Sequence, residues 1–382
     1  MAAFSSTERT EIEPERHASW LELFFDLCFV VAVGAVAHTL HDHPTADGAV
    51  LFAALFIPVW WSWMMYAWYA TSFPERGAII RFGAFAAMLT VLAMAAQVGR
   101  ASAGDPRGYL LAFVVFHAIV VILYLRAAGI YAERRVFAIR YATGFALAAA
   151  VWFVSLAVPA EMRSWVWAVA LGIDLLTPWF AVVSVPERTF DVSHIPERYG
   201  LFSIIVLGEA IIAVARGTAD SEWTMQAAVA AVAGFVIAVV IWWAYFARPP
   251  TSLLLRGRIP AFVWGNGHLF VWAGIAVTGV GIELAIEAAE SSHGFPITER
   301  LILCGGFALY LAALALLRAA EAGSFTDRIA LMRLATAAVI VALGISGAAL
   351  SPEILTLVMA AITVGAGSLI RFAWRSQPAP AA

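Results

Sequence analysis

The chain contains no lysine and little charge of any kind. Its 23 basic residues are all arginine, and charged residues make up 13% of the 382 residues, against about a quarter in typical soluble domains. Apolar residues make up 63%. Such a chain has too few polar side chains to cover a water-exposed surface, so the composition indicates an integral membrane protein.

Chemically specialised motifs are also missing. The two cysteines, Cys28 and Cys304, both lie in apolar runs and give neither a disulfide framework nor metal-ligand spacing. No phosphate-binding loop, dinucleotide fingerprint, zinc-protease motif or nucleophile elbow is present. We therefore predict no metal, no cofactor and no enzymatic activity. The arginines form no basic face interleaved with aromatics, which excludes nucleic acid as a partner.

Long apolar runs are abundant instead. A helix needs about 20 apolar residues to cross a hydrocarbon core of about 30 Å, and twelve such runs can be placed. They cover residues 20–40, 48–71, 78–99, 109–126, 138–158, 164–184, 198–217, 224–247, 262–286, 300–320, 329–350 and 353–373.

The arginines are distributed unequally between the two sides of these spans. With the N-terminus inside, eighteen fall on the inner side, and five fall on the outer side: Arg100, Arg107, Arg163, Arg216 and Arg300. This bias predicts that both termini lie in the cytoplasm. The acidic segment 1–19 lacks the basic start of a signal peptide, so we expect the first span to be retained.

Short matches recur at a nearly constant spacing. The offset is 182 residues early in the chain and 192 to 193 later. The matched pairs are Pro14-Glu15-Arg16 with Pro196-Glu197-Arg198, Trp60-Trp61 with Trp242-Trp243, and Leu125-Arg126 with Leu317-Arg318. We therefore predict an all-α polytopic membrane protein of about twelve transmembrane helices in two parallel six-helix repeats, residues 1–190 and 191–382, with a shared pathway between them.

Two acids interrupt the first apolar run. Glu22 and Asp26 are four residues apart, so they share one helical face about 6 Å from each other. A carboxylate near the middle of a bilayer costs about 2.5 to 3.5 kcal/mol on insertion scales, which marks Asp26 as a candidate proton or cation site. Glu22 is nearer the helix start, where capping of its own helix is an equally good interpretation.

Glu209 is the corresponding acid of the second repeat. Subtracting the offset of 182 gives position 27, so we expect Asp26 and Glu209 to face each other between the halves. Arg198 and Arg216 share a helical stripe with Glu209. The nearer one, Arg216, is about 10 Å away along the axis, a distance that predicts a polar groove without a direct salt bridge. Hydrogen bonding of a neutral Glu209 to a neighbouring helix is the alternative.

The approach to the seventh span carries a second set of polar residues. Pro196 predicts a helix start at residue 196 or 197, with Glu197 at its positive end. We expect Arg16, His194, Glu197, Arg198 and Arg216 to brace or gate the entrances to the pathway.

Further polar residues lie within the spans. Asp174 precedes Thr177-Pro178, where proline frees a backbone carbonyl, as at many cation sites. His117, Asn266 and His268 complete the set, with hydrogen bonding between helices as the alternative role for each.

Three of these segments carry a family resemblance. SWLELFFDL at residues 19–27, ERYGLF at 197–202 after His194, and IVLGE at 205–209 resemble the bacterial low temperature requirement protein A family. Tyr199 stands where that family would have phenylalanine. The resemblance implies a polytopic inner-membrane protein named for growth in the cold and leaves its biochemistry open.

The leading hypothesis is a secondary, proton-coupled transporter of an ion or small molecule, with Asp26, Glu209 and Asp174 as the protonation or cation sites. A cation channel is the first alternative. Phe24-Phe25-Asp26 partly matches the Phe-Ser-Asp motif of the two-repeat endolysosomal potassium channels, which the chain resembles in its six-plus-six architecture. The phenylalanines around Asp26 argue against a pore-lining face. The second alternative is a membrane protein that acts on or senses a lipid.

Overall fold

The structure is a computed structural model that describes residues 19–73, 77–182, 194–219, 224–247, 251–291 and 294–375. It is all-helical over these ranges. The α-helices are α1 (Trp20–Asp42), α2 (Ala46–Ser72), α3 (Ala78–Ser102), α4 (Arg107–Ile130), α5 (Arg135–Val154), α6 (Ala160–Val182), α7 (His194–Ala219), α8 (Met225–Phe246), α9 (Arg258–Ser291), α10 (Ile297–Ala322), α11 (Arg328–Ser346) and α12 (Pro352–Arg375). Short 3₁₀ helices, η1 (Ala132–Arg134), η2 (Thr251–Leu255) and η3 (Gly347–Ala349), lie between them.

The helices confirm the prediction of twelve spans. Each is long and apolar enough to cross a membrane. Large apolar side chains are exposed on the outward faces, as expected of a lipid-facing surface. Polar side chains begin several of the helices: Ser19, Thr45, Thr224 and Asp327 accept hydrogen bonds from backbone N–H groups of the first turns.

α7 begins earlier than predicted. Its first residue is His194, two residues before Pro196. The proline is tolerated because the N–H groups of the first helical turn have no partner inside the helix, so its missing N–H costs nothing there. Arg198 lies in the second turn of α7, and its side chain contacts α1.

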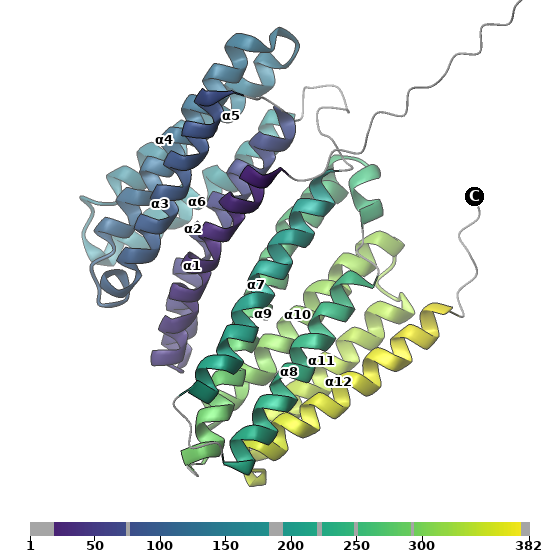
Figure 1. The fold of residues 1–382 in the computed structure, drawn as a ribbon. Helices are drawn as coiled ribbons and strands as arrows, with labels where there is room; N and C mark the ends of the chain where they lie inside the picture. Colours follow the sequence, from purple (N-terminus) through teal and green to yellow (C-terminus); the bar gives the residue numbers. More distant parts are fainter. Residues whose placement is uncertain are drawn as a thin grey trace, which may run out of the picture.

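The twelve helices form two groups. Figure 1 shows α1–α6 on one side of the molecule and α7–α12 on the other. Contacts between the groups are made mainly by α1 and α2 against α7 and α9. Equivalence of the two groups as repeats stays a prediction. Trp60 and Trp61 are buried, at 1% and 2% exposure, whereas the matched Trp242 and Trp243 are 48% and 49% exposed.

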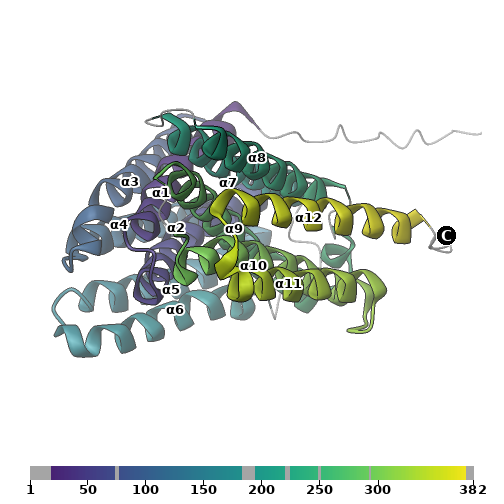
Figure 2. The same cartoon turned by 90° about the horizontal axis from the view of Figure 1, so that it is seen from below.

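α9 is the central helix of the second group. It packs against α7, α8, α10 and α12, and also against α1 and α2 (Figure 2). Glycines let it approach α10 closely: a Cβ placed on Gly281 would lie 2.3 Å from the Cα of Leu303, and one on Gly306 would lie 2.6 Å from the N of Thr278. Small residues that bring backbones together in this way are typical of helix packing in membranes.

Candidate functional site

A buried cluster of charged side chains joins α1 to α7. Arg198 is 1% exposed, and its Nη2 donates to Oδ1 of Asp26 at 2.8 Å, while its Nη1 donates to Oε1 of Glu22 at 3.3 Å. Nε1 of Trp63, from α2, donates to the same Asp26 oxygen at 2.8 Å. These four residues, named the Arg198 cluster, form a charged link between the two groups of helices.

Two buried polar atoms of the Arg198 cluster have no hydrogen-bond partner among the described residues. They are Oδ2 of Asp26 and Nε of Arg198. Asp26 is 0% exposed, so neither of its oxygens reaches bulk solvent. One oxygen therefore accepts two hydrogen bonds while the other is left to accept a proton or a small ligand.

Glu22 caps its own helix and also contacts Arg198. Its carboxylate accepts the N–H of Ser19 at 2.7 Å, and the Ser19 hydroxyl accepts the N–H of Glu22 at 3.3 Å, which together form a capping box. Its other oxygen contacts Arg198. The cap holds the start of α1 in place beside α7.

An aromatic layer lies next to the Arg198 cluster. Phe29 from α1, Trp63 from α2, Phe202 from α7 and Trp272 from α9 are each 0% exposed. Phe202 lies 4.5 Å from the rings of both Trp63 and Trp272, and 6.0 Å from the ring of Phe29. The layer packs the centre of the interface between the two groups with aromatic rings.

A second charge cluster lies beyond this layer. Arg216 in α7 forms ion pairs with Glu209 of the same helix and, at 3.1 Å, with Glu283 of α9. We name these three residues the Arg216 cluster. The prediction that Glu209 and Arg216 are too far apart for a salt bridge is wrong. Side chains on a helix lean toward its N-terminus, so the long arginine reaches back along α7 to the carboxylate.

Glu209 faces Gly34 of α1 and does not face Asp26. A Cβ placed on Gly34 would lie 2.8 Å from Oε2 of Glu209. Since Arg198 contacts Asp26 and the later residue Glu209 lies at the later residue Gly34, α1 and α7 run side by side in the same direction. Eight residues of helix, about 12 Å, separate the level of Asp26 from that of Gly34. The expected Asp26–Glu209 pair is therefore not formed.

Asp174 and His117 form a pair within the first group of helices. Nε2 of His117 and Oδ1 of Asp174 are 3.0 Å apart, and Nε1 of Trp152 donates to Oδ2 at 2.9 Å. Nδ1 of His117 must donate to the carbonyl of Phe113, at 3.0 Å, because a carbonyl only accepts. The contact between His117 and Asp174 ties α4 to α6.

His268 and Asn266 form hydrogen bonds to residues of α8 and α9 in the second group. Nδ1 of His268 donates to the carbonyl of Trp264 at 2.7 Å, and the Tyr245 hydroxyl donates to Nε2 at 3.0 Å. Both ring nitrogens are thus satisfied in a neutral imidazole. The Asn266 amide donates to the carbonyl of Phe262 at 2.9 Å, and its Oδ1 is buried with no hydrogen-bond partner among the described residues.

Arg16, His194 and Glu197 were also predicted to brace or gate the entrances. Arg16 and the His194 side chain fall outside the described residues. Glu197 is half-buried in the first turn of α7, beside Arg198.

The prediction from sequence did not include the polar residues at the other end of α1. Nε2 of His41 lies 3.1 Å from both carboxylate oxygens of Glu287 in α9. Among the described residues, two groups have the geometry of metal ligands: His41 with Glu283 and Glu287, and His38 with His41 and Asp42. The spacing of Glu283 and Glu287, four residues apart near a helix end, was the available signal.

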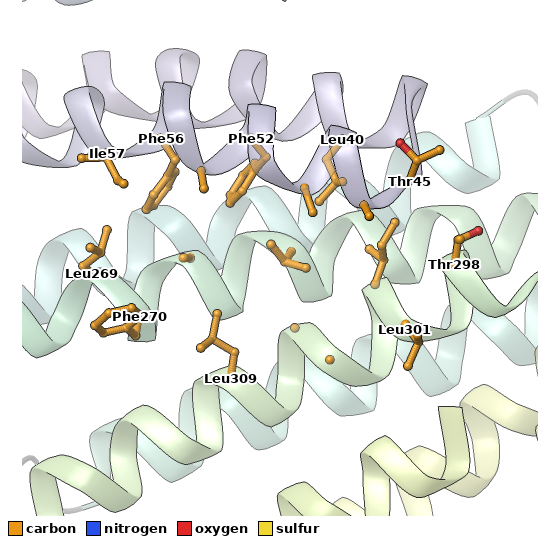
Figure 3. Close-up of a pocket in the computed structure, with 18 residues that line it drawn as sticks. Leu40, Thr45, Phe52, Phe56, Ile57, Leu269, Phe270, Thr298, Leu301 and Leu309 are labelled. Atoms are coloured by element: carbon orange, nitrogen blue, oxygen red, sulfur yellow. The ribbon is translucent and has the colours of Figure 1, made fainter. Parts of the chain in front are cut away.

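A groove also opens between the two groups of helices. It has a volume of about 490 Å³ and runs between α2 on one side and α9 and α10 on the other (Figure 3). Its lining is apolar apart from Thr45 and Thr298 at one end, and includes Phe52, Phe56 and Phe270. Such a lining suits a hydrocarbon chain.

Comparisons with known proteins agree with the resemblance seen in the sequence. A family model described as bacterial low temperature requirement A protein matches residues 17–365. The chain is also similar to an uncharacterized protein, RA0937, of Rhizobium meliloti (strain 1021). The two are 29% identical over 327 residues, which cover 80% of this chain and 78% of the relative.

Proposed function

We propose that this chain, which belongs to the bacterial low temperature requirement A protein family, is a proton-coupled secondary transporter with its pathway between α1 and α7. The supporting observation is the buried pair of Asp26 and Arg198. It joins the two groups of helices, and it leaves one oxygen of Asp26 without a partner among the described residues.

Protonation of Asp26 gives this pair a way to couple to transport. A neutral Asp26 loses its ionic attraction to Arg198, while the contact between Arg198 and Glu22 at 3.3 Å still balances the guanidinium charge. The protonated protein therefore favours an arrangement in which Asp26 and Arg198 separate. A proton that binds the two arrangements with different affinity shifts the equilibrium between them.

The Arg216 cluster supplies the corresponding link at the other end of the pathway. Arg216 ties Glu209 to Glu283, and the aromatic layer of Phe29 and Phe202 lies between this cluster and Arg198. Opening one charged link while the other stays closed is the behaviour expected of a transporter whose two halves rock around a central site.

The arginine bias predicts which side of the membrane each end of the pathway faces. With both termini in the cytoplasm of a bacterial inner membrane, the Arg198 cluster faces the cytoplasm and the Arg216 cluster faces outward. The His117–Asp174 pair, within the first group, is assigned a structural role in this proposal.

Proton movement in proteoliposomes tests the proposal. Vesicles that contain the purified chain and an internal pH-sensitive dye are challenged with potassium, sodium or choline. The intact chain is expected to change the internal pH with one of these or another small cation, whereas Asp26→Asn and Glu209→Gln each abolish the response. Glu133→Gln, an exposed acid in η1, is the matched control and is expected to respond normally.

Normal proton coupling in both Asp26→Asn and Glu209→Gln would contradict the proposal. Unitary currents in planar bilayers would instead support the cation channel, a function that the buried aromatic layer disfavours because its rings fill the interface. The apolar groove favours the lipid-related alternative. Copurification of one lipid species with the chain, combined with no ion movement, would support that function.

A further inference from the structure

We propose that His41, Glu283 and Glu287 form a binding site for a divalent first-row transition metal such as Zn²⁺ or Mn²⁺. The three side chains come from two helices on opposite sides of the interface between the groups: His41 from the last turn of α1, and the two glutamates from α9. Their ligand atoms lie within 4.8 Å of one another. This site does not depend on the proposed transport activity.

The distances at the site fit a shared ion. Nε2 of His41 is equally far, 3.1 Å, from both oxygens of Glu287, whereas a single directed hydrogen bond would favour one oxygen. Ligands bound to Zn²⁺ at about 2.0 to 2.2 Å lie about 3.0 to 3.5 Å from each other. The imidazole and the carboxylate are therefore already spaced as neighbouring ligands.

The charges around the site are unbalanced. Three carboxylates, of Glu209, Glu283 and Glu287, meet the single guanidinium of Arg216. With His41 protonated beside Glu287, two positive charges oppose three negative charges, and the group carries a formal charge of −1. Glu283 is only 4% exposed, so solvent screens this charge poorly. A divalent cation that replaces the proton of His41 brings the group to neutrality.

Exposure and chemistry define the class of ion. Glu287 is 47% exposed, which gives an ion a route from solvent to the buried Glu283. One imidazole and two carboxylates suit zinc, manganese or iron(II), while magnesium and calcium prefer all-oxygen ligands. Nδ1 of His41 lies 3.6 Å from Oδ1 of Asp42, which places a carboxylate behind the ligand ring.

The neighbouring group of His38, His41 and Asp42 is a weaker candidate. Its three residues lie on one helix, and the side chains of His38 and Asp42 are 56% and 51% exposed. Ordering two mobile side chains costs conformational entropy that the buried Glu283 does not require. The site that spans two helices is therefore favoured.

Zinc titration of the full chain in detergent micelles tests the site. Calorimetry with ZnCl₂ is expected to show one saturable site per chain, which excess Mg²⁺ does not displace. His41→Ala and Glu287→Gln are each expected to weaken Zn²⁺ binding by more than about tenfold. His43→Ala, an exposed histidine just past α1, is the matched control and should bind as the intact chain does.

The outcomes are distinguishable. Absence of saturable binding, or unchanged affinity in Glu287→Gln, would overturn the proposal. Loss of affinity in His38→Ala with full affinity in Glu287→Gln would place the ion on the α1 group instead, and would also overturn it. Each variant is checked for a monodisperse elution profile, which separates loss of the site from misfolding.

Discussion

At the scale of single residues, the arginines determine what the buried acids do. Glu22, Asp26 and Glu209 could be predicted from sequence as special because a carboxylate within an apolar run is costly. The residues that pair with these acids could not be predicted from sequence. Arg198 is 172 residues from Asp26 in the chain, and no local spacing rule connects them. Arg216 could have been predicted as the partner of Glu209, since both lie on α7. The estimate from spacing along the helix axis missed the pair because it neglected the length and the direction of the arginine side chain.

The Arg198 cluster makes a prediction about stability. Arg198→Met leaves two carboxylates beside Trp63 without their guanidinium, and we expect it to lower the free energy of unfolding by about 3 to 5 kcal/mol. Adding Asp26→Asn removes one of the stranded charges. The double variant is therefore expected to be more stable than Arg198→Met alone.

Thermal unfolding in detergent, monitored by tryptophan fluorescence, measures this double-mutant cycle. Additive losses would mean that the two side chains do not interact energetically. Arg375→Met, an exposed arginine at the end of α12, provides the control for loss of an arginine as such.

At the scale of helices, the long apolar runs predicted each of the twelve membrane-spanning helices, but several helix ends differ from their prediction. α9 extends over 34 residues, from 258 to 291, although its apolar run covers 262–286. The added turns carry polar residues such as Glu287 and Glu290, which hydropathy assigns to a loop. That assignment removed Glu287 from the candidate ligands, and so the sequence predicted no metal site.

The start of α11 gives a pH-dependent prediction. Partial burial of Asp327 opposes ionisation, but hydrogen bonds from Arg318 and from the N–H of Ala330 outweigh it and hold the pKa of Asp327 below its ordinary value. A lowered folded-state pKa stabilises the protein at pH values above about 3.9, the ordinary pKa of aspartate. This stability is lost as the pH falls toward the folded-state value.

Unfolding of Asp327→Asn and Asp327→Ala between pH 3 and pH 7 checks this role. Asparagine still caps a helix, so Asp327→Asn should lose only the ionic contribution of the carboxylate. Its free energy of unfolding should therefore fall less steeply than that of the intact chain as the pH is lowered. Alanine also loses the cap, which costs about 1 kcal/mol at every pH. An unchanged pH dependence in both variants would show that Asp327 contributes nothing ionic.

At the scale of the molecule, the two groups of helices and their contact through α1, α2, α7 and α9 agree with a two-part chain. The order of packed neighbours is partly shared: α1 packs on α3 and α3 on α4, as α7 packs on α9 and α9 on α10. α8 packs on α12, however, whereas α2 packs on α4. The repeat stays a prediction, because apolar sequence matches say little about which faces pack together.

The orientation of the chain is open to direct measurement. Eighteen arginines on one side predict cytoplasmic termini, and twelve spans put both termini on the same side. A green fluorescent protein fused after Ala382 should fluoresce, and alkaline phosphatase fused there should be inactive. The reverse result would invert the assignment of the Arg198 and Arg216 clusters to the two membrane surfaces.

The length and position of α9 have a mechanical consequence. At about 1.5 Å per residue its 34 residues span about 51 Å, and it packs against helices of both groups. Trp272 lies beside Phe202 next to one cluster, and Glu283 belongs to the other. In the proposed transporter, a rigid tilt of α9 about a point between these two residues would move one end toward α1 and the other end away from it.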